Sequence, residues 1–398
     1  MMLALGLPAM MAAFGVAADF SILALKRTNL QSAADQASLA AAKELTVASS
    51  TDSMIVAAAV NYATAALAKN DSSAAVQASV DHTAGSVTVS ISEAWTPFMA
   101  QFINAGVTPI NVVATAKTAG ATNICVLALD QKDNKTFYMD TDAKLSANGC
   151  GVYSDADHNH AIWLDQNATL KADLTCAVGG IKYKKGGSIV PAGVTNCPPV
   201  ANPLSTRAIP TIPTACLKNN LVISTGSAVL QPGKYCGGLK VEGTAQVTLQ
   251  PGVYVITGAP LTVRGTATFK GNHVGFYLDG DKSLIDFADN SVIDLSGSTD
   301  PDMAGLLFFE DPTIAANNQH HIASTAVQNL TGTIYLKNGT LLIDPNAVVA
   351  GQSAYTALIV NRLQLSAGPE LVLNSDYGAT DVPVPAGIRS SSSVILAN

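Results

Sequence analysis

The sequence predicts a mainly β fold, a parallel β-helix or β-solenoid that follows an N-terminal transmembrane α-helix and a small α/β module. Two near-repeats carry this prediction. The segment LQPGKY at residues 230–235 recurs as LQPGVY at residues 249–254, and LKVEGTA at residues 239–245 recurs as LTVRGTA at residues 261–267. Offsets of 19 and 22 residues are typical of coils that stack on one another, because such short strands cannot bury a face alone.

Apolar and polar residues alternate within each predicted coil, which indicates strands with one buried face. The side chains expected to point inward are those of Leu230, Val241, Leu249 and Val263, and those expected to point outward are Lys234, Lys240, Glu242 and Arg264. The Pro-Gly pairs predict type II turns at equivalent corners of successive coils, with Tyr235 and Tyr254 stacked on each other. The alternative is an antiparallel sandwich with these corners at opposite ends.

The coil domain is expected to span residues 123–389, followed by a tail at residues 390–398. Six prolines fall between Pro191 and Pro213. Proline cannot donate a hydrogen bond to a strand ladder. We therefore expect this segment to leave the stack as an extended excursion and to return to it.

The six cysteines all lie in the expected coil domain and form no C-x-x-C pair, which favours disulfides over zinc. Neighbouring cysteines are separated by about one coil, a distance that a disulfide can bridge because adjacent strands lie about 4.8 Å apart. The predicted pairs are Cys125 with Cys150, Cys176 with Cys197, and Cys216 with Cys236. Disulfides would place this domain outside the cytoplasm. Six reduced, buried thiols are the alternative.

Residues 1–122 form a separate N-terminal region. Its first 18 residues carry no charge, and an apolar helix of that length nearly matches the hydrocarbon thickness of a bilayer. We expect a membrane helix at residues 1–25, helices within residues 28–69, and a small α/β module at residues 76–119. A cleaved signal peptide is the alternative, since Val16-Ala17-Ala18 is an acceptable cleavage pattern.

The N-terminal region resembles the TadE/TadG-type proteins of the bacterial tight-adherence (Flp) pilus assembly system. The resemblance is carried by the apolar start, by Asp19, and by the helix LQSAADQASLAAA at residues 30–42. It implies a pilin-like α/β module, a single-pass protein of the bacterial inner membrane with a periplasmic or extracellular C-terminal domain, and other Tad/Flp pilus assembly proteins as partners. Together with a solenoid that shows no convergent polar site, it predicts a structural role without catalysis.

Two other classes of function stay open. One is a surface adhesin, and the other is a secreted β-solenoid protein that binds or degrades polysaccharide. Exposed aromatic stripes would favour polysaccharide binding, but aromatic residues are 6% of the chain and Trp95 and Trp163 are its only tryptophans. A formal net charge of −7 without a basic cluster argues against nucleic-acid binding.

Three groups of residues suggest chemistry in the sequence. The segment from Asp155 to His160 and the pair His320-His321 contain metal-ligand types, but both also read as ordinary polar turns. Asp286, Asp289 and Asp294 are similar to the carboxylates of β-solenoid polysaccharide enzymes, although alternation also explains them as outward-facing positions. No nucleophile-elbow, zinc-protease or phosphate-loop motif is present. The sequence therefore predicts no catalytic, cofactor-binding or metal residue, no cofactor and no small-molecule substrate.

Overall fold

A computed structural model describes residues 2–44, 52–67, 73–81, 86–98, 106–119, 122–315, 318–389 and 393–397. The chain divides into two compact units, one made of residues 1–121 with residues 391–398 and the other of residues 122–390. We call them the N-terminal unit and the coil domain. The coil domain is thus inserted into the sequence of the N-terminal unit.

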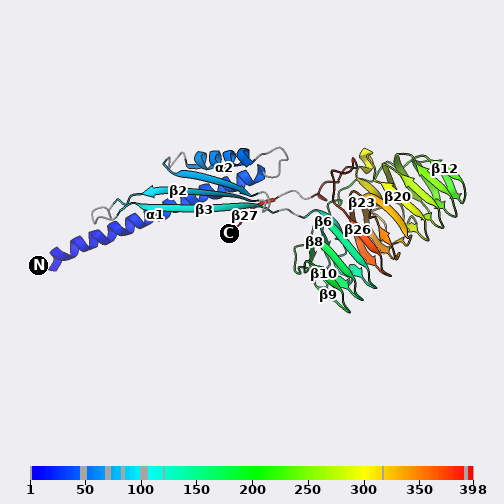
Figure 1. The fold of residues 1–398 in the computed structure, drawn as a ribbon, viewed down its shortest axis with the longest axis horizontal. Helices are drawn as coiled ribbons and strands as arrows, with labels where there is room; N and C mark the ends of the chain where they lie inside the picture. The colour runs from blue at the N-terminus through cyan, green and yellow to red at the C-terminus, as the bar shows by residue number, and fades with distance from the viewer. Residues whose placement is uncertain are drawn as a thin grey trace. The chain divides into compact units, whose positions relative to one another are not determined.

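The N-terminal unit combines two helices with a four-stranded antiparallel sheet of order β1-β2-β3-β27 (Figure 1). Its elements are α1 (Met2–Glu44), α2 (Asp52–Leu67), β1 (Ala75–Asp81), β2 (Ser86–Trp95), β3 (Thr108–Ala119) and β27 (Ser393–Ala397). The tail predicted at residues 390–398 needs correction. Its residues Ser393–Ala397 form an edge strand on β3, whereas residues 390–392 and 398 lie outside the described residues.

Helix α1 is buried along its second half, and several large apolar side chains between residues 14 and 25 are exposed. Small residues at helical spacing let the helix lie close to the sheet, and the buried set is Leu30, Ala33, Ala34, Ala37, Ala41 and Ala42. Further toward the N-terminus, Phe14, Phe20 and Leu25 are 76%, 71% and 65% exposed. Lys26 Nζ lies 2.6 Å from the buried Glu93 carboxylate of β2, where the exposed part begins. The predicted membrane helix at residues 1–25 is therefore part of one longer helix, and no described helix combines the length and hydropathy of a membrane span.

The coil domain is built of short strands, which confirms its mainly β character. The strands are β4 (Ile124–Ala128), β5 (Phe137–Met139), β6 (Lys144–Ser154), β7 (Ile162–Leu164), β8 (Thr169–Ala177), β9 (Ile181–Tyr183), β10 (Ser188–Val190), β11 (Lys218–Ile223), β12 (Ser227–Leu230), β13 (Gly233–Val241), β14 (Gln246–Leu249), β15 (Gly252–Thr257), β16 (Leu261–Val263), β17 (Thr268–Gly271), β18 (Val274–Asp279), β19 (Ile285–Phe287), β20 (Val292–Ser296), β21 (Leu306–Glu310), β22 (Gln319–Ile322), β23 (Ala326–Ile343), β24 (Val348–Val349), β25 (Thr356–Leu365) and β26 (Glu370–Leu373). A short 3₁₀ helix, η2 (Pro301–Met303), precedes β21.

Each of these strands pairs in parallel with a strand about one coil away. Leu239 of β13 is in register with Leu261 of β16, which is in register with Ile285 of β19. The inward side chains form one continuous core that includes Leu230, Val241, Leu249 and Val263, as predicted. Among the residues predicted to point outward, Lys240 and Arg264 are exposed, whereas Lys234 and Glu242 are partly buried. These parallel ladders exclude the antiparallel sandwich.

The order of the coils in space differs from their order along the chain. Strand β4 pairs with β25 through Val126 and Leu358, and β5 pairs with the same strand through Phe137 and Leu363. The chain therefore enters the stack at its middle and builds coils outward to β9 and β10. It then restarts at β11, at the opposite end, and returns to the middle at β25 and β26 (Figure 1). The domain's first strand meets its last residues where the Ile124 amide donates to the Ile388 carbonyl over 2.9 Å.

The two copies of LQPG occupy adjacent coils but are only partly equivalent. Leu230 is in register with Leu249, and the rings of Tyr235 and Tyr254 stack with centroids 5.9 Å apart. Beyond the corner, however, Gly233 pairs with Tyr254 and not with Gly252, so the register slips by two residues. The φ angles of Gly233 and Gly252 are positive, at 146° and 135°, but lie well above the roughly 80° of a type II turn. The type II prediction was therefore wrong, because both glycines adopt a more extended backbone than the second central residue of a type II turn.

A segment at residues 191–217, which we call the crossing segment, connects β10 to β11. It corresponds to the predicted proline-rich excursion. Along it, Leu204, Val200 and Ile212 pack against an apolar column on the outside of the stack, where Tyr277, Phe309 and other residues are in register. That column consists of Val255, Tyr277, Phe309, Tyr335, Ile359 and Leu127. The crossing segment thus covers an outward face that would otherwise expose aromatic side chains to water.

Candidate functional site

One file of partly or fully exposed side chains runs along the coil stack, and we call it the outer file. Successive members are in register on neighbouring strands, so they lie about 4.8 Å apart along the stack. In spatial order the file contains Val222, Lys240, Thr262, Asp286, His321, Leu342, Gln364, Tyr138, Trp163 and Lys182. Its two halves differ in chemistry, and each is described in turn.

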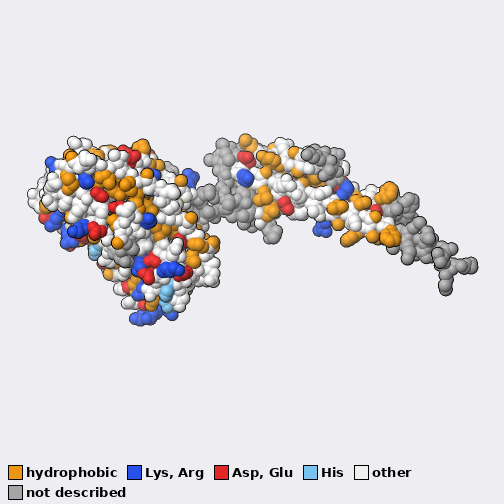
Figure 2. All heavy atoms as spheres, turned by 180° about the vertical axis from the view of Figure 1, so that it is seen from behind, with side chains coloured by type: hydrophobic (Ala, Val, Ile, Leu, Met, Phe, Trp, Pro, Cys, Tyr) orange, Lys and Arg blue, Asp and Glu red, His pale blue; other side chains and the backbone are white. Residues whose placement is uncertain are grey.

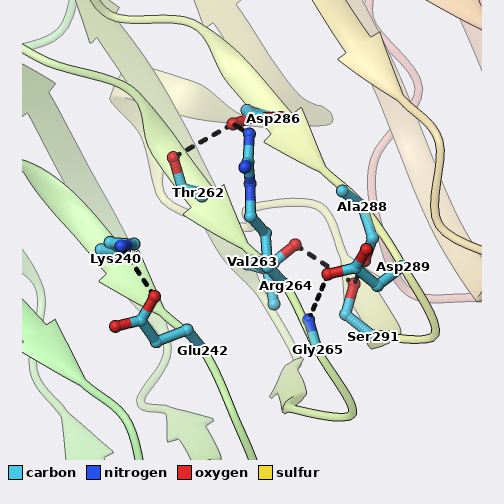
Figure 3. A network of polar contacts seen from close by, with 10 residues as sticks. All are labelled: Lys240, Glu242, Thr262, Val263, Arg264, Gly265, Asp286, Ala288, Asp289 and Ser291. Carbon is cyan, nitrogen blue, oxygen red and sulfur yellow. Dashed lines mark hydrogen bonds and ion pairs between the residues drawn. The ribbon is translucent and has the colours of Figure 1, made fainter.

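The half from Lys240 to His321, which we call the paired half, is a network of matched charges (Figure 3). Arg264 Nη2 lies 2.6 Å from Asp286 Oδ2, and the Thr262 hydroxyl donates to the same oxygen over 3.4 Å. Lys240 Nζ lies 2.7 Å from Glu242 Oε2, and the hydrogen bond from Lys240 lowers the Glu242 pKa. Because each of these partly exposed charges has its counterpart, the paired half leaves little net charge for a ligand.

A corner beside this network is fixed by backbone contacts. Asp289, at φ 60°, accepts a hydrogen bond from the Gly265 amide over 2.8 Å. The Ser291 hydroxyl donates to the Ala288 carbonyl over 2.9 Å (Figure 3). Asp289 therefore shapes a turn and is not arranged beside a second carboxylate.

The other half, which we call the aromatic half, is formed by Tyr138 and Trp163 with Lys135, His160 and Lys184. The Tyr138 and Trp163 rings meet edge to face with centroids 6.2 Å apart, and His160 lies 5.3 Å from Trp163. Lys135 Nζ lies 4.1 Å from the Tyr138 ring centre and 4.4 Å from that of Trp163. Figure 2 shows Lys or Arg and His side chains gathered over the end of the stack where β7 and β9 lie. This cluster was not predictable from the sequence, because its members come together only through the stacking of coils.

The residues with metal-ligand chemistry are not brought together. Asp155 Oδ1 accepts from the Val200 amide over 2.9 Å, Asp157 pairs with Lys132, and His158 Nδ1 accepts from the His160 amide. Burial raises the pKa of Asp155. Within the described ranges, no three His, Cys, Asp or Glu side chains are placed to hold a metal ion.

The three carboxylates Asp286, Asp289 and Asp294 are separated by their partners. Asp286 forms an ion pair with Arg264, and Asp289 accepts a hydrogen bond from the Gly265 amide. Asp294 lies on a different ladder, where its carboxylate is 3.6 Å from Lys270 Nζ. They thus form no facing pair of carboxylates.

A buried polar pair in the coil interior was not recognised in the sequence. His320 Nε2 lies 2.9 Å from Glu310 Oε1, and both side chains are fully buried. The Ile285 amide donates to His320 Nδ1, and the Asn338 amide donates to Glu310 Oε2. Since Nδ1 accepts, Nε2 carries the proton and donates to Glu310. His321, on the outer file, contacts Asp344 instead, so the two neighbouring histidines have separate environments.

The structure contains the three disulfides that the cysteine spacing predicts. Cys125 is joined to Cys150, Cys176 to Cys197, and Cys216 to Cys236, with Cα separations of 5.5, 6.0 and 5.8 Å. The last two flank the crossing segment. This segment is therefore attached covalently to β8 at one end and to β13 at the other.

Residues 1–44 match the model of the Tad family, described as Flp pilus-assembly TadE/G-like. The match covers α1 and ends where that helix ends, and it confirms the resemblance seen in the N-terminal sequence. No curated protein matches the chain, and no solved structure does.

Proposed function

We propose that this protein is a membrane-anchored, extracytoplasmic structural component of a Flp-type pilus assembly system. The observation that carries the proposal is the match of residues 1–44 to the TadE/G-like family. That match indicates involvement in Flp pilus assembly. The remaining steps concern the anchor and the compartment of the coil domain.

The form of α1 supports the anchor. Its second half packs on an antiparallel sheet, while its earlier part presents Phe14, Phe20 and Leu25 to the surroundings. Exposed aromatic and aliphatic side chains of this kind cost free energy in water, so a lipid or protein environment around them is favourable. We therefore propose that α1 enters the inner membrane or a helical pilus-assembly partner through this part.

Three disulfides support an extracytoplasmic coil domain, because cytosolic reductants keep thiols reduced. The outer face of the domain offers matched charges in the paired half. We propose a structural rather than catalytic role on that ground.

Reporter fusions test the topology. Alkaline phosphatase joined after Thr122 is expected to be active, and the same enzyme joined after a chain that lacks residues 1–25 is expected to be inactive. Deletion of the gene is expected to abolish assembled Flp pili, and restoring the wild-type chain should restore them. Normal pili in the deletion strain, or an inactive Thr122 fusion, would overturn the proposal.

A further inference from the structure

We propose that the aromatic half of the outer file is a binding site for a linear acidic polysaccharide. The inference goes beyond a role in pilus assembly and does not depend on it. It rests on the contrast between the two halves of one file. Lys240, Arg264 and His321 all lie within ion-pair distance of carboxylates, whereas Lys135, Lys182 and Lys184 make no ion pair within the part of the chain that the structure describes.

Two of these lysines, Lys135 and Lys184, lie over aromatic rings. Lys135 Nζ contacts the faces of Tyr138 and Trp163, and Lys184 Nζ lies 5.9 Å from the Trp163 ring. A cation over an aromatic face is attracted by the ring and loses little mobility when an anion arrives. The cluster therefore presents ordered positive charge that is not neutralised within the described structure.

The indole of Trp163 supplies a second, independent observation. Its Nε1 atom is buried and has no hydrogen-bond partner. A buried indole N–H usually finds an acceptor, because leaving it unpaired costs free energy. An oxygen of a bound sugar supplies that acceptor only when the side chains that cover the indole nitrogen move aside.

A polar hollow continues the site along the stack. It has a volume of about 460 Å³ and is lined by Asn134, Lys135, Tyr138, Gln319, Arg362 and Gln364. Gln364 is the next member of the file after Tyr138. Amide side chains both donate and accept hydrogen bonds, which suits a chain of hydroxyl groups. Together, the hollow and the file form an elongated site that suits a linear polymer.

The carboxylates beside the cluster disfavour a densely charged polymer such as a nucleic-acid duplex. Tyr138 faces two carboxylates, and burial, with Asp140 and Asp165 adding to it, raises the pKa of Tyr138 to about 12. A nucleic-acid duplex, with one charge per about 1.7 Å of its axis, would be repelled by these carboxylates. Lys135 lies over one face of each ring, which limits the stacking of bases there. A polyuronate is a single chain with one carboxylate on each sugar, and it can place these carboxylates on the lysines.

The test uses the purified full chain with intact disulfides, and alginate as the probe. Binding is measured by affinity electrophoresis and by titration calorimetry, with dextran as the neutral polymer and a thymidine oligonucleotide as the nucleic acid. The wild-type protein is expected to bind alginate, with an affinity that falls as the salt concentration rises. It is not expected to bind dextran. The double variant Lys135→Gln/Lys184→Gln should weaken alginate binding by at least about tenfold, because it removes both ordered cations.

Two further variants complete the design. Lys240→Gln, in the paired half of the same file, is the matched control and should change the affinity less than about twofold. Trp163→Phe keeps a ring but removes the N–H, and should weaken binding without lowering the melting midpoint much. Absence of alginate binding, equal retention on dextran, tighter binding of the oligonucleotide, or an unchanged affinity of the double variant would each overturn the proposal. None of these outcomes bears on pilus assembly or on the topology of the chain.

Discussion

Glu310 and His320 face each other inside the coil stack, 2.9 Å apart and fully buried, at positions where neighbouring coils place leucine or isoleucine. Leu278 is in register with Glu310, and Leu341 with His320. Every ring nitrogen and carboxylate oxygen of the pair has a partner, two of them backbone amides. The pair is therefore satisfied only as a unit.

Removal of one partner should be costly. His320→Ala leaves the Glu310 carboxylate buried without its donor and the Ile285 amide without its acceptor, so we expect a loss of roughly 3 kcal/mol in the free energy of unfolding. Denaturant unfolding of the purified chain measures this. His321→Ala is the control, since the half-exposed pair with Asp344 should contribute less than about 1 kcal/mol. Equal losses in the two variants would contradict the role given to the buried pair.

Gly252 is required at its corner for two reasons. Its φ of 135° disfavours any side chain, and a Cβ atom would lie 2.5 Å from Cγ of Pro232 in the coil before it. Gly252→Ala should therefore destabilise the domain by more than about 2 kcal/mol, beyond the 1–2 kcal/mol or so of a strained backbone alone. Gly280→Ala is the matched control, because Gly280 has φ 87° and open space around its Cα. Thermal unfolding measures both variants. If Gly280→Ala lowers the melting midpoint more than Gly252→Ala does, close packing against Pro232 is not what requires glycine at position 252.

The disulfides at the ends of the crossing segment should protect it from proteases. In the chain with Cys197→Ser and Cys216→Ser, we expect trypsin to cut after Arg207, whose guanidinium otherwise donates to the carbonyls of Pro301 and Asp302. Mass spectrometry of the digest identifies this cut. The single variant Cys216→Ser should lose on the order of 3 kcal/mol of stability for a loop of this size. Resistance of the double variant equal to that of the wild type would show that packing alone holds the segment.

Alkaline pH should destabilise the coil domain through its buried tyrosines. Burial raises the pKa of Tyr235 to about 12, above the roughly 10 of an unfolded chain. Because the folded state favours the protonated hydroxyl, which donates to the Gln231 carbonyl over 2.7 Å, stability is intact below pH 10 or so and falls as the pH rises toward 12. Unfolding midpoints measured across this range test the sign. In the Tyr235→Phe variant, stability should fall less steeply as the pH rises toward 12. If it falls as steeply as in the wild type, groups other than Tyr235 cause the loss.

The sequence pattern predicted what is local and repetitive. Inward positions such as Val241 and Val263 follow from alternation, and the pairing of Cys216 with Cys236 follows from a spacing of one coil. The order of the coils was not predictable in this way. Strand β4 lies in the middle of the stack, where it pairs with β25. A strand at the end of a stack would bury the same types of aliphatic side chain, so the composition of β4 does not indicate its position.

The aromatic half of the outer file was missed for a related reason. Gln364 and Tyr138 are neighbours in space but far apart in the chain, so no window of sequence contains both. Edge strand β27 was also missed, since its short apolar run directly follows a run of serines and pairs with β3, more than 270 residues earlier in the chain. Long-range register is a property of the assembled fold and not of any single segment.

The hydrogen bond from Ile124 to Ile388 holds the two ends of the coil domain together. This arrangement affects how the number of coils can change. Because the chain enters and leaves the stack near its middle, the coil ends at β9 and at β12 are both remote from the point of attachment. Insertion or loss of a whole repeat at either extremity would alter the reach of the domain while leaving its junction with residues 1–121 untouched. The architecture thus allows either extremity of the coil array to change in length without altering the two ends through which the chain connects it to residues 1–121.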